Sequence, residues 1–272
     1  MPEGDTLHRT ASGLAPHLVG RQVIAARVPP GGPQVQRIVG ATILTVEAVG
    51  KNLLIRFDNG LELRTHLRMT GSWHRYRPGE RWRRPPARAR LVIEVPGAVA
   101  VCFDAPVVEL FEARAEAIHP TLAALGPDLL AHDWGAAHEA EARRRLTDPA
   151  RAAMTTSAAL LDQRALAGIG NIWRNETLFY ERVNPWARVG ALDEATMERL
   201  VRTARRLLLE SVTRPPGRSP MWVYRRAGRP CHACGTLVRS APPDRGIQRT
   251  TYWCPSCQRG EGTIDGGDRR QL

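Results

Sequence analysis

Hydrophobic residues near the start of the chain recur at the spacing of a helix. Between residues 3 and 19, small and apolar side chains lie three or four positions apart, at Leu7, Ala11, Leu14, Ala15 and Leu18. That spacing places them on one face of a helix. The pattern therefore predicts a helix over residues 3–19 with one buried face.

The pattern then changes to that of short strands. Residues 53–57 and 61–65 alternate around Asp58-Asn59-Gly60, and residues 90–95 and 99–103 flank Pro96-Gly97. Apolar alternation on both sides of such a turn predicts a β-hairpin. Repeated short strands of this kind are typical of a β-sandwich or barrel. Together with the leading helix they predict an N-terminal domain over residues 1–125.

From about residue 133 to 212 the pattern is helical. Acidic residues at Asp193 and Glu194 mark a helix start, and Gly168 and Gly170 interrupt the pattern as a turn between two helices would. We expect a helical domain over 126–220, ending in a Pro/Gly/Arg-rich linker at 214–220. A small element over 221–258 and a Gly-rich disordered tail, 259–272, complete an α+β multidomain chain.

Composition narrows the class of partner. The 272 residues carry a net charge of +12, and basic grooves concentrate phosphates. Arg enrichment in a GC-rich genome would explain Arg in place of Lys, but not the surplus of basic residues. No apolar run reaches the roughly 20 residues that span a bilayer, and MPEGDTLHR lacks the apolar core of a signal peptide. We expect a cytoplasmic, nucleoid-associated protein with no membrane contact.

One basic residue differs from all the others. Among the 39 basic side chains, Lys51 is the only lysine. Proton transfer and imine chemistry need an ammonium that can lose its proton, which a guanidinium cannot supply. Chance retention is the alternative reading of a single lysine.

Four of the five cysteines form a metal-binding pattern. Cys231-x₂-Cys234 and Cys254-x₂-Cys257 are separated by 19 residues, which is zinc-ribbon spacing. Four thiolates close a tetrahedron, so the spacing predicts one structural Zn²⁺ that holds a hairpin over 236–253. A disulfide is disfavoured in a cytoplasmic chain. Cys102, alone in a strand, is expected to be a buried apolar residue.

The extreme N-terminus offers a second chemical signal. Removal of Met1 would expose the secondary amine of Pro2, and an α-amino group has a pKa near ~8. A secondary amine that attacks a sugar C1′ forms an iminium ion. However, proline also favours the start of a helix, and Glu3 could simply stabilise the helix dipole. Composition alone favours that helical interpretation.

Four motifs in order along the chain resemble one family. The segments are MPEGDT at 1–6, Gly50-Lys51-Asn52, LLDQRALAGIGN at 160–171 and QRTTYWCPSCQ at 248–258. They are similar to the N-terminus, catalytic-lysine turn, helix–two-turn–helix signature and zinc-finger hairpin of the formamidopyrimidine-DNA glycosylase/endonuclease VIII family. PEGD resembles the endonuclease VIII branch. The resemblance extends from residue 2 to residue 258.

The resemblance implies a catalytic role for four residues. Pro2 would attack C1′, expel the base and form a Schiff base, and Glu3 would be a general acid/base. Lys51 would bind a phosphate and assist proton transfers. Arg249 would clamp the phosphates that flank the lesion and donate the proton for the second elimination. These roles imply a bifunctional glycosylase/lyase that cleaves by β,δ-elimination.

The resemblance also implies three DNA-binding residues. Asn171 would bind a phosphate. The segment His66–Gly71 looks like the family's intercalation loop, with Met69 as the apolar wedge that fills the hole left by a flipped base and Arg68 as its polar neighbour. An ordinary core position is the alternative for Met69.

Two departures from the family bear on the substrate. The 8-oxoguanine branch fills the void partly with an Arg and a Phe from a later loop, and residues 104–108 here supply neither. The linker at 213–221 is short for that branch's lesion-capping loop. Both departures favour oxidised pyrimidines. The resemblance implies a monomer that acts on double-stranded DNA with oxidised bases or abasic sites. Three alternatives remain: 8-oxoguanine or formamidopyrimidine specificity, a non-catalytic damaged-DNA binding protein, and an RNA-binding zinc-ribbon protein.

Overall fold

The computed structural model describes residues 2–214, 221–243 and 249–260. The chain divides into two compact units, Met1–Leu130 and Ala131–Leu272. Most of the predicted linker at 214–220, and the part of the predicted tail beyond residue 260, lie outside the described residues, as do Met1 and Gln248.

The first unit is a β-sandwich with a helix along it. One antiparallel sheet has the order β1 (Ala25–Arg27), β6 (Ala89–Val95), β7 (Ala98–Phe103) and β5 (Ser72–Tyr76). The other has the order β2 (Ile43–Val49), β3 (Asn52–Phe57), β4 (Leu61–His66) and β8 (Val107–Glu112). Short 3-10 helices lie between β1 and β2 at η1 (Val35–Ile38), between β5 and β6 at η2 (Pro86–Arg88), and after β8 at η3 (Ala113–Ile118). Both predicted hairpins are confirmed.

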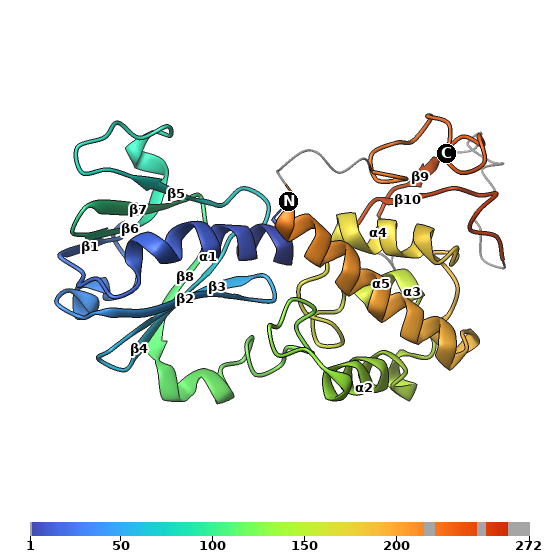
Figure 1. Cartoon of the computed structure of the whole chain (residues 1–272), viewed down its shortest axis with the longest axis horizontal. Coiled ribbons are helices and arrows are strands. Elements are labelled where there is room, and N and C mark those ends of the chain that lie inside the picture. The colour runs from blue at the N-terminus through green and yellow to red at the C-terminus, as the bar shows by residue number, and fades with distance from the viewer. Residues whose placement is uncertain (1, 215–220, 244–248, 261–272) are drawn as a thin grey trace. The chain divides into compact units, whose positions relative to one another are not determined.

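Helix α1 (Gly4–Leu18) contacts strands of both sheets and lies alongside them in Figure 1. Its apolar face enters the main core with the inward side chains of β3 and β6. The buried helical residues include Leu7, Ala11, Leu14 and Leu18, as the sequence spacing predicts. Burial of such side chains stabilises a fold by about 1.5–3 kcal/mol each. This packing fixes the helix start, where Pro2 and Glu3 lie.

The second unit is mainly helical. It contains α2 (Ala136–Leu146), η4 (Pro149–Arg151), α3 (Thr156–Leu161), α4 (Asn171–Tyr180), η5 (Val189–Ala191) and α5 (Glu194–Thr213). The carboxylate of Asp193 accepts a hydrogen bond from the Thr196 amide at 2.7 Å, so the predicted start of the last helix is confirmed by its N-cap. Gly168 and Gly170 lie in the turn between α3 and α4, as predicted.

A two-stranded hairpin completes the second unit. It consists of β9 (Arg239–Ala241) and β10 (Thr251–Trp253), paired antiparallel with Trp253 opposite Arg239. Figure 1 shows β10 beside α4, and the two elements are in contact. The observed architecture is therefore the predicted one: a β-sandwich with an N-terminal helix, a helical region and a C-terminal β-hairpin.

Candidate active site

The N-terminal proline and glutamate lie at the start of α1. Glu3 is the N-cap residue, and its carbonyl oxygen accepts the amides of Thr6 at 3.0 Å and Leu7 at 3.1 Å. The Glu3 side chain is fully buried, whereas Pro2 is half-buried. A carboxylate excluded from water is costly unless it is paired or hydrogen-bonded. Its burial here places an acid/base group next to the half-exposed proline.

Lys51 lies in a tight turn between β2 and β3. Val49 pairs with Asn52, so Gly50 and Lys51 form a two-residue hairpin loop, and Gly50 has a φ of +58°. Glycine adopts that conformation at little cost, whereas a β-carbon would be strained. Nδ2 of the Asn52 side chain donates to the Val49 carbonyl at 3.0 Å, which braces the turn that carries the lysine.

A buried arginine supports this turn from the neighbouring strand. Nε of Arg64 on β4 donates to Oδ1 of Asn52 at 2.9 Å, and both side chains are buried. A hydrogen bond to a charged donor contributes about 1.5–3 kcal/mol. Asn52 is therefore held on both sides, and the backbone of Lys51 is fixed beside it.

Asp128 connects the lysine turn to α1. Its Oδ2 accepts the Gly50 amide at 2.8 Å and lies 3.9 Å from Nε2 of His8, in the second turn of the helix. One carboxylate is thus hydrogen-bonded to the turn that carries Lys51 and lies near a side chain of the helix that begins after Glu3. Nothing in the local sequence pattern singled out His8 or Asp128, because this contact joins residues 78 positions apart.

The segment expected to form the intercalation loop is a turn between β4 and β5. Leu67 is buried, while Arg68 and Met69 are exposed, Met69 by 58%. The Gly71 amide donates to the Leu67 carbonyl at 2.9 Å and closes the turn. Arg68 has a φ of +45°, which is strained for a residue with a side chain. Met69 is therefore not a core residue, and the loop presents it to solvent.

His66 precedes this loop and stabilises it in the neutral form. The pKa of His66 is lowered to about 4. Burial is the main cause, and the positive charges of Arg64, Arg68 and Lys51 add to it. The unprotonated Nδ1 accepts the Arg68 amide at 3.1 Å. This bond requires a neutral ring, since both nitrogens of a charged imidazole are donors.

In the second unit, Asn171 is the first residue of α4 and is nearly buried. Its Nδ2 donates to the Thr250 carbonyl at 3.1 Å, and its Oδ1 accepts from Arg174. The amide is thus engaged next to Arg249, which is exposed. The start of a helix is a general site for phosphate, because its backbone N–H groups and the helix dipole favour an anion. Asn171 therefore joins that helix start to the strand that follows Arg249.

Further polar residues of α4 hold the hairpin. Nη1 of the fully buried Arg174 donates to Oγ1 of Thr251 at 3.0 Å. Oδ1 of Asn175 accepts the Tyr252 amide at 2.9 Å. Sequence reasoning did not assign these two side chains, because charged and amide residues in a helix are usually solvated. The residue that follows Arg249 and the first half of β10 are consequently fixed to α4.

Glu176 makes a similar connection to the chain that leads into the cysteines. Its carboxylate accepts the amides of Trp222, Val223 and Tyr224 at 2.8, 3.0 and 2.9 Å. Burial raises the pKa of Glu176, and the three amide donors oppose that shift. The carboxylate satisfies three backbone groups that would otherwise be buried without an acceptor.

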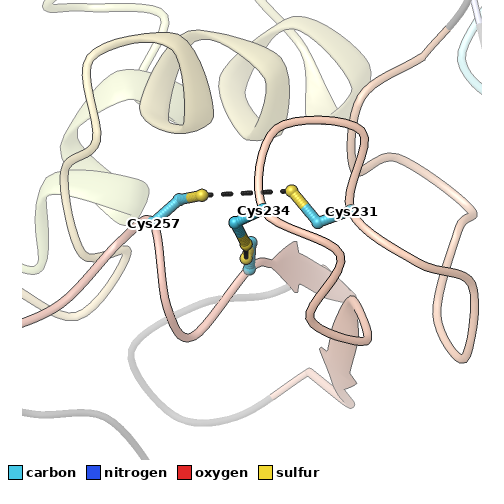
Figure 2. Close-up of side chains that lie close together, drawn as sticks. Cys231, Cys234 and Cys257 are labelled. Atoms are coloured by element: carbon cyan, nitrogen blue, oxygen red, sulfur yellow. Dashed lines mark hydrogen bonds between the residues drawn. The ribbon is translucent and has the colours of Figure 1, made fainter.

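The four cysteines of the predicted zinc ribbon come together in two knuckles. Their sulfur atoms all lie within 4.8 Å of one another, with 3.9 Å between Cys231 and Cys257 and 3.4 Å between Cys234 and Cys254. Figure 2 shows the sulfur atoms of Cys231 and Cys257 facing each other, with Cys234 between the two residues in this view. Tetrahedral zinc with Zn–S bonds of about 2.3 Å separates sulfurs by about 3.8 Å. The donor set and its spacing therefore fit a metal ion.

Each knuckle is closed by its own hydrogen bonds. The Gly235 amide donates to the Cys231 carbonyl at 2.9 Å, and Gln258 donates to the Cys254 carbonyl at the same distance. Oε1 of the fully buried Gln258 accepts the Cys254 amide at 3.0 Å, and its Nε2 donates to the Val183 carbonyl at 2.9 Å. Gln258 thereby anchors the second knuckle to the loop after α4.

The candidate residues fall into two groups. The first unit contains Pro2, Glu3, Lys51, Arg68 and Met69. Within it, Asp128 binds the lysine turn, and the pairing of β3 with β4 connects that turn to the strand that leads into the exposed loop. Asn171, Arg249 and the four cysteines belong to the second unit, joined through α4. Cys102 is fully buried in β7, as expected.

Residues 1–106 match the formamidopyrimidine-DNA glycosylase N-terminal domain, and residues 125–219 match the formamidopyrimidine-DNA glycosylase H2TH domain. The chain belongs to the formamidopyrimidine-DNA glycosylase/endonuclease VIII family.

Relatives agree with this placement along the whole length. A Streptomyces coelicolor protein named "Probable endonuclease 8 2" is 40% identical over 98% of this chain and 97% of its own length. A Mycolicibacterium smegmatis protein named "DNA-(apurinic or apyrimidinic site) lyase Nei2" is 36% identical over 95% of this chain and 99% of its own. The chain is accordingly a DNA-repair glycosylase and lyase of this family.

Solved structures show the same fold. The Lactococcus lactis formamidopyrimidine-DNA glycosylase in complex with abasic-site DNA superposes with a TM-score of 0.80 at 20% identity, over 95% of this chain and all of that one.

Across the described residues, no helix combines the length and apolar character needed to cross a membrane.

Proposed function

We propose that this protein is a bifunctional DNA glycosylase and abasic-site lyase that removes oxidised bases, pyrimidines by preference, from double-stranded DNA as a monomer. The observation that supports the proposal is that Asp128 lies between the turn that carries Lys51 and the helix that begins after Glu3. Asp128 accepts the Gly50 amide and lies against His8 of α1. A nucleophile, an acid/base and an ammonium group at one place are what imine-forming excision requires.

The proposed first step uses Pro2 and Glu3. After removal of Met1, the lone pair of the Pro2 nitrogen forms a bond to C1′ while the bond from C1′ to the base breaks. The departing base takes a proton, the sugar ring opens, and a proton delivered by Glu3 to the ring oxygen gives the open-chain iminium ion. The fully buried carboxyl of Glu3 is next in sequence to the nucleophile.

The proposed second stage cleaves the strand. Loss of the C2′ proton to a base, with the iminium as electron sink, expels the 3′ phosphate, and a further elimination expels the 5′ phosphate. Lys51 would bind a phosphate near C1′ and assist these proton transfers. The α4 start at Asn171 and the exposed Arg249 would hold phosphates, with Arg249 as proton donor in the second elimination. Water releases the iminium and regenerates the proline.

The metal in this proposal is structural. Cys231, Cys234, Cys254 and Cys257 would hold one Zn²⁺ with all four positions filled, which leaves no open position for a reacting group. Bound zinc supplies fold stability to a hairpin that α4 contacts through Thr250, Thr251 and Tyr252. Release of the metal is expected to loosen the segment that presents Arg249.

The preference for pyrimidines rests on the void-filling residues. Met69 is exposed on its loop and would fill the space left by the flipped base, with Arg68 beside it. The stretch after β7, from Asp104 to Val108, contains no Arg or Phe. Part of the linker at 213–221 lies outside the described residues. Specificity for 8-oxoguanine or formamidopyrimidine lesions is the second candidate.

Borohydride trapping tests the proposal. Protein with its native N-terminus is incubated with duplexes that carry dihydrouracil, 8-oxoguanine opposite cytosine, or an abasic site. We expect a reduced covalent complex on dihydrouracil and on the abasic site. Trapping mainly on 8-oxoguanine would reverse the substrate preference but keep the imine mechanism. Binding to all three duplexes without trapping or cleavage would identify a non-catalytic damaged-DNA binding protein.

Two variants separate the role of the proline from that of the fold. Pro2→Gly keeps an amine, so some trapping and strand cleavage should remain. Protein with an N-terminal extension that blocks the amine should bind abasic DNA but form no covalent complex. Normal turnover by the blocked protein would refute the assignment of Pro2.

A further inference from the structure

The segment between β5 and β6 is rich in arginine and has no role in the chemistry above. Residues 77–88 contain five arginines and one acid, Glu80. The Glu80 carboxylate accepts the backbone amide of Arg77 at 2.9 Å, so it closes the turn at the beginning of the segment. The segment therefore carries a large positive excess in a short stretch of chain.

An aromatic anchor holds this segment on the outer face of its sheet. The Trp82 ring stacks on Tyr76 with 6.1 Å between centroids, and its edge meets Phe103 at 5.8 Å. The backbone amide of Arg83 donates to the Tyr76 hydroxyl at 3.0 Å. Aromatic pairs of this geometry contribute about 0.5–1.5 kcal/mol beyond burial. Trp82 thus acts as an anchor, and the arginines on either side of it are exposed.

The same segment is fixed to the exposed loop that carries Met69. Nη1 of Arg84 donates to Oδ2 of Asp104 at 2.6 Å and points to the Thr70 carbonyl at 3.4 Å. Nε of Arg88 donates to the other oxygen of Asp104 at 2.8 Å. Asp104 has a φ of +53°, which is strained for a residue with a side chain. Both arginines therefore bind Asp104, and the loop is reached at Thr70, whose carbonyl accepts from Arg84 and whose hydroxyl donates to the Asp104 carbonyl at 3.4 Å.

The remaining arginines of the segment are not neutralised. Within the part of the chain that the structure describes, no carboxylate lies within 4.0 Å of the guanidinium groups of Arg77, Arg81 or Arg83. All three side chains are exposed. Clustered exposed arginines on a fixed backbone give a local positive potential that attracts phosphates.

We propose that residues 77–88 bind phosphates of the undamaged DNA strand beside the Met69 wedge. This inference rests on the proposed function, because it takes Met69 as the group that replaces the flipped base. A wedge in that position faces the orphaned base of the other strand. The Pro2 chemistry acts on the damaged strand, whereas a segment tied to the wedge loop lies next to the strand that the wedge faces.

The salt dependence of DNA binding measures the number of arginine–phosphate contacts. Each phosphate neutralised by an arginine adds about 0.9 to the slope of log K against log salt. The variant Arg81→Gln/Arg83→Gln keeps Trp82 and the Arg84–Asp104 contact, so the segment should stay in place. Binding to a duplex with an uncleavable abasic analogue should weaken, and the slope should fall by about 1.8.

A matched control is available at the other end of the sandwich. Arg21 and Arg37 are exposed, and Arg21 donates to the carbonyl of Pro96 in the turn between β6 and β7. The variant Arg21→Gln/Arg37→Gln removes the same charge away from the wedge loop. Its slope should match that of the wild type. An equal loss of slope in both variants would refute a specific phosphate site, because it would reflect net charge alone.

Uncharged methylphosphonate groups in place of phosphates identify the DNA strand that the arginines bind. Methylphosphonates around the orphaned base in the undamaged strand should abolish the difference between wild type and Arg81→Gln/Arg83→Gln. The same replacement in the damaged strand should leave that difference unchanged. The reverse result would overturn the proposal. Borohydride trapping is scored separately, so failure of the Pro2 chemistry and failure of this phosphate site give different results.

Discussion

Acidification should weaken the first unit through His66. Its pKa is lowered to about 4, mainly by burial, with Arg64, Arg68 and Lys51 adding to the shift. In the unfolded chain an imidazole has a pKa of about 6.5. The unfolded state therefore binds more protons between these two values. Stability is complete above about pH 6.5 and is lost as the pH falls toward 4.

The magnitude follows from the two pKa values. The two pKa values differ by about 2.5, which corresponds to about 3.4 kcal/mol of stability over the full pH window. Between pH 7 and pH 5 the loss of stability is about 1.8 kcal/mol. His66 is only partly buried, so screening by solvent reduces the expected loss to about 1 kcal/mol. Protonation also removes the acceptor of the Arg68 amide, so the loop should loosen together with the loss of stability.

The measurement compares wild type with His66→Gln. Urea unfolding at pH 7 and pH 5 is followed through the amide resonances of β4, and titration groups common to both proteins cancel in the difference. We expect the wild type to lose about 1 kcal/mol more than His66→Gln on acidification. An equal loss in both proteins, or a His66 ring resonance that titrates near its unfolded value, would refute the argument.

Three further predictions concern the framework around the site. Glu176→Ala should destabilise the second unit by about 3–5 kcal/mol, because three backbone amides, one of them buried and two partly buried, lose their acceptor. Glu176→Gln should destabilise it by less, because one oxygen remains. Equal urea midpoints for the two variants would contradict this. Gly71→Ala should lower the free energy of unfolding by about 1–3 kcal/mol, since the new β-carbon would lie 2.7 Å from the Leu67 carbonyl oxygen. Gly13→Ala, in open space on α1, should raise it by about 0.5–1 kcal/mol. Thermal unfolding of the two variants measures both changes. Cys254→Ser should release zinc, measured by atomic absorption, and weaken DNA binding, measured by gel shift; unchanged zinc content would refute the ribbon.

Local sequence pattern predicts the elements that local physics determines. The β3–β4 hairpin follows from the Asp58-Asn59-Gly60 turn, and the last helix begins at the capping residue Asp193. The cysteine spacing likewise predicts the clustered thiols. In each case the turn, cap or knuckle is formed by residues within a few positions of one another, so the sequence carries the whole signal.

The sequence did not predict the contacts that connect these elements. Asp128 meets Gly50 across 78 positions, and Arg174 meets Thr251 across 77. Arg174 is fully buried although arginine in a helix is normally solvated. Short strands such as β1, with three residues, also lack a period long enough to detect. Long-range polar pairing depends on the folded arrangement, which residue spacing does not encode.

The lysine turn has a consequence for chemical labelling. Lys51 is the only lysine in the sequence, and its backbone is braced by Asn52 and Arg64. In the proposed mechanism the α-amine belongs to Pro2. Reductive methylation with a ¹³C reagent would therefore mark the two reacting amines of the site without a background from other lysines. The chain thus carries its own pair of spectroscopic reporters, with which protonation and substrate binding can be followed at the site itself.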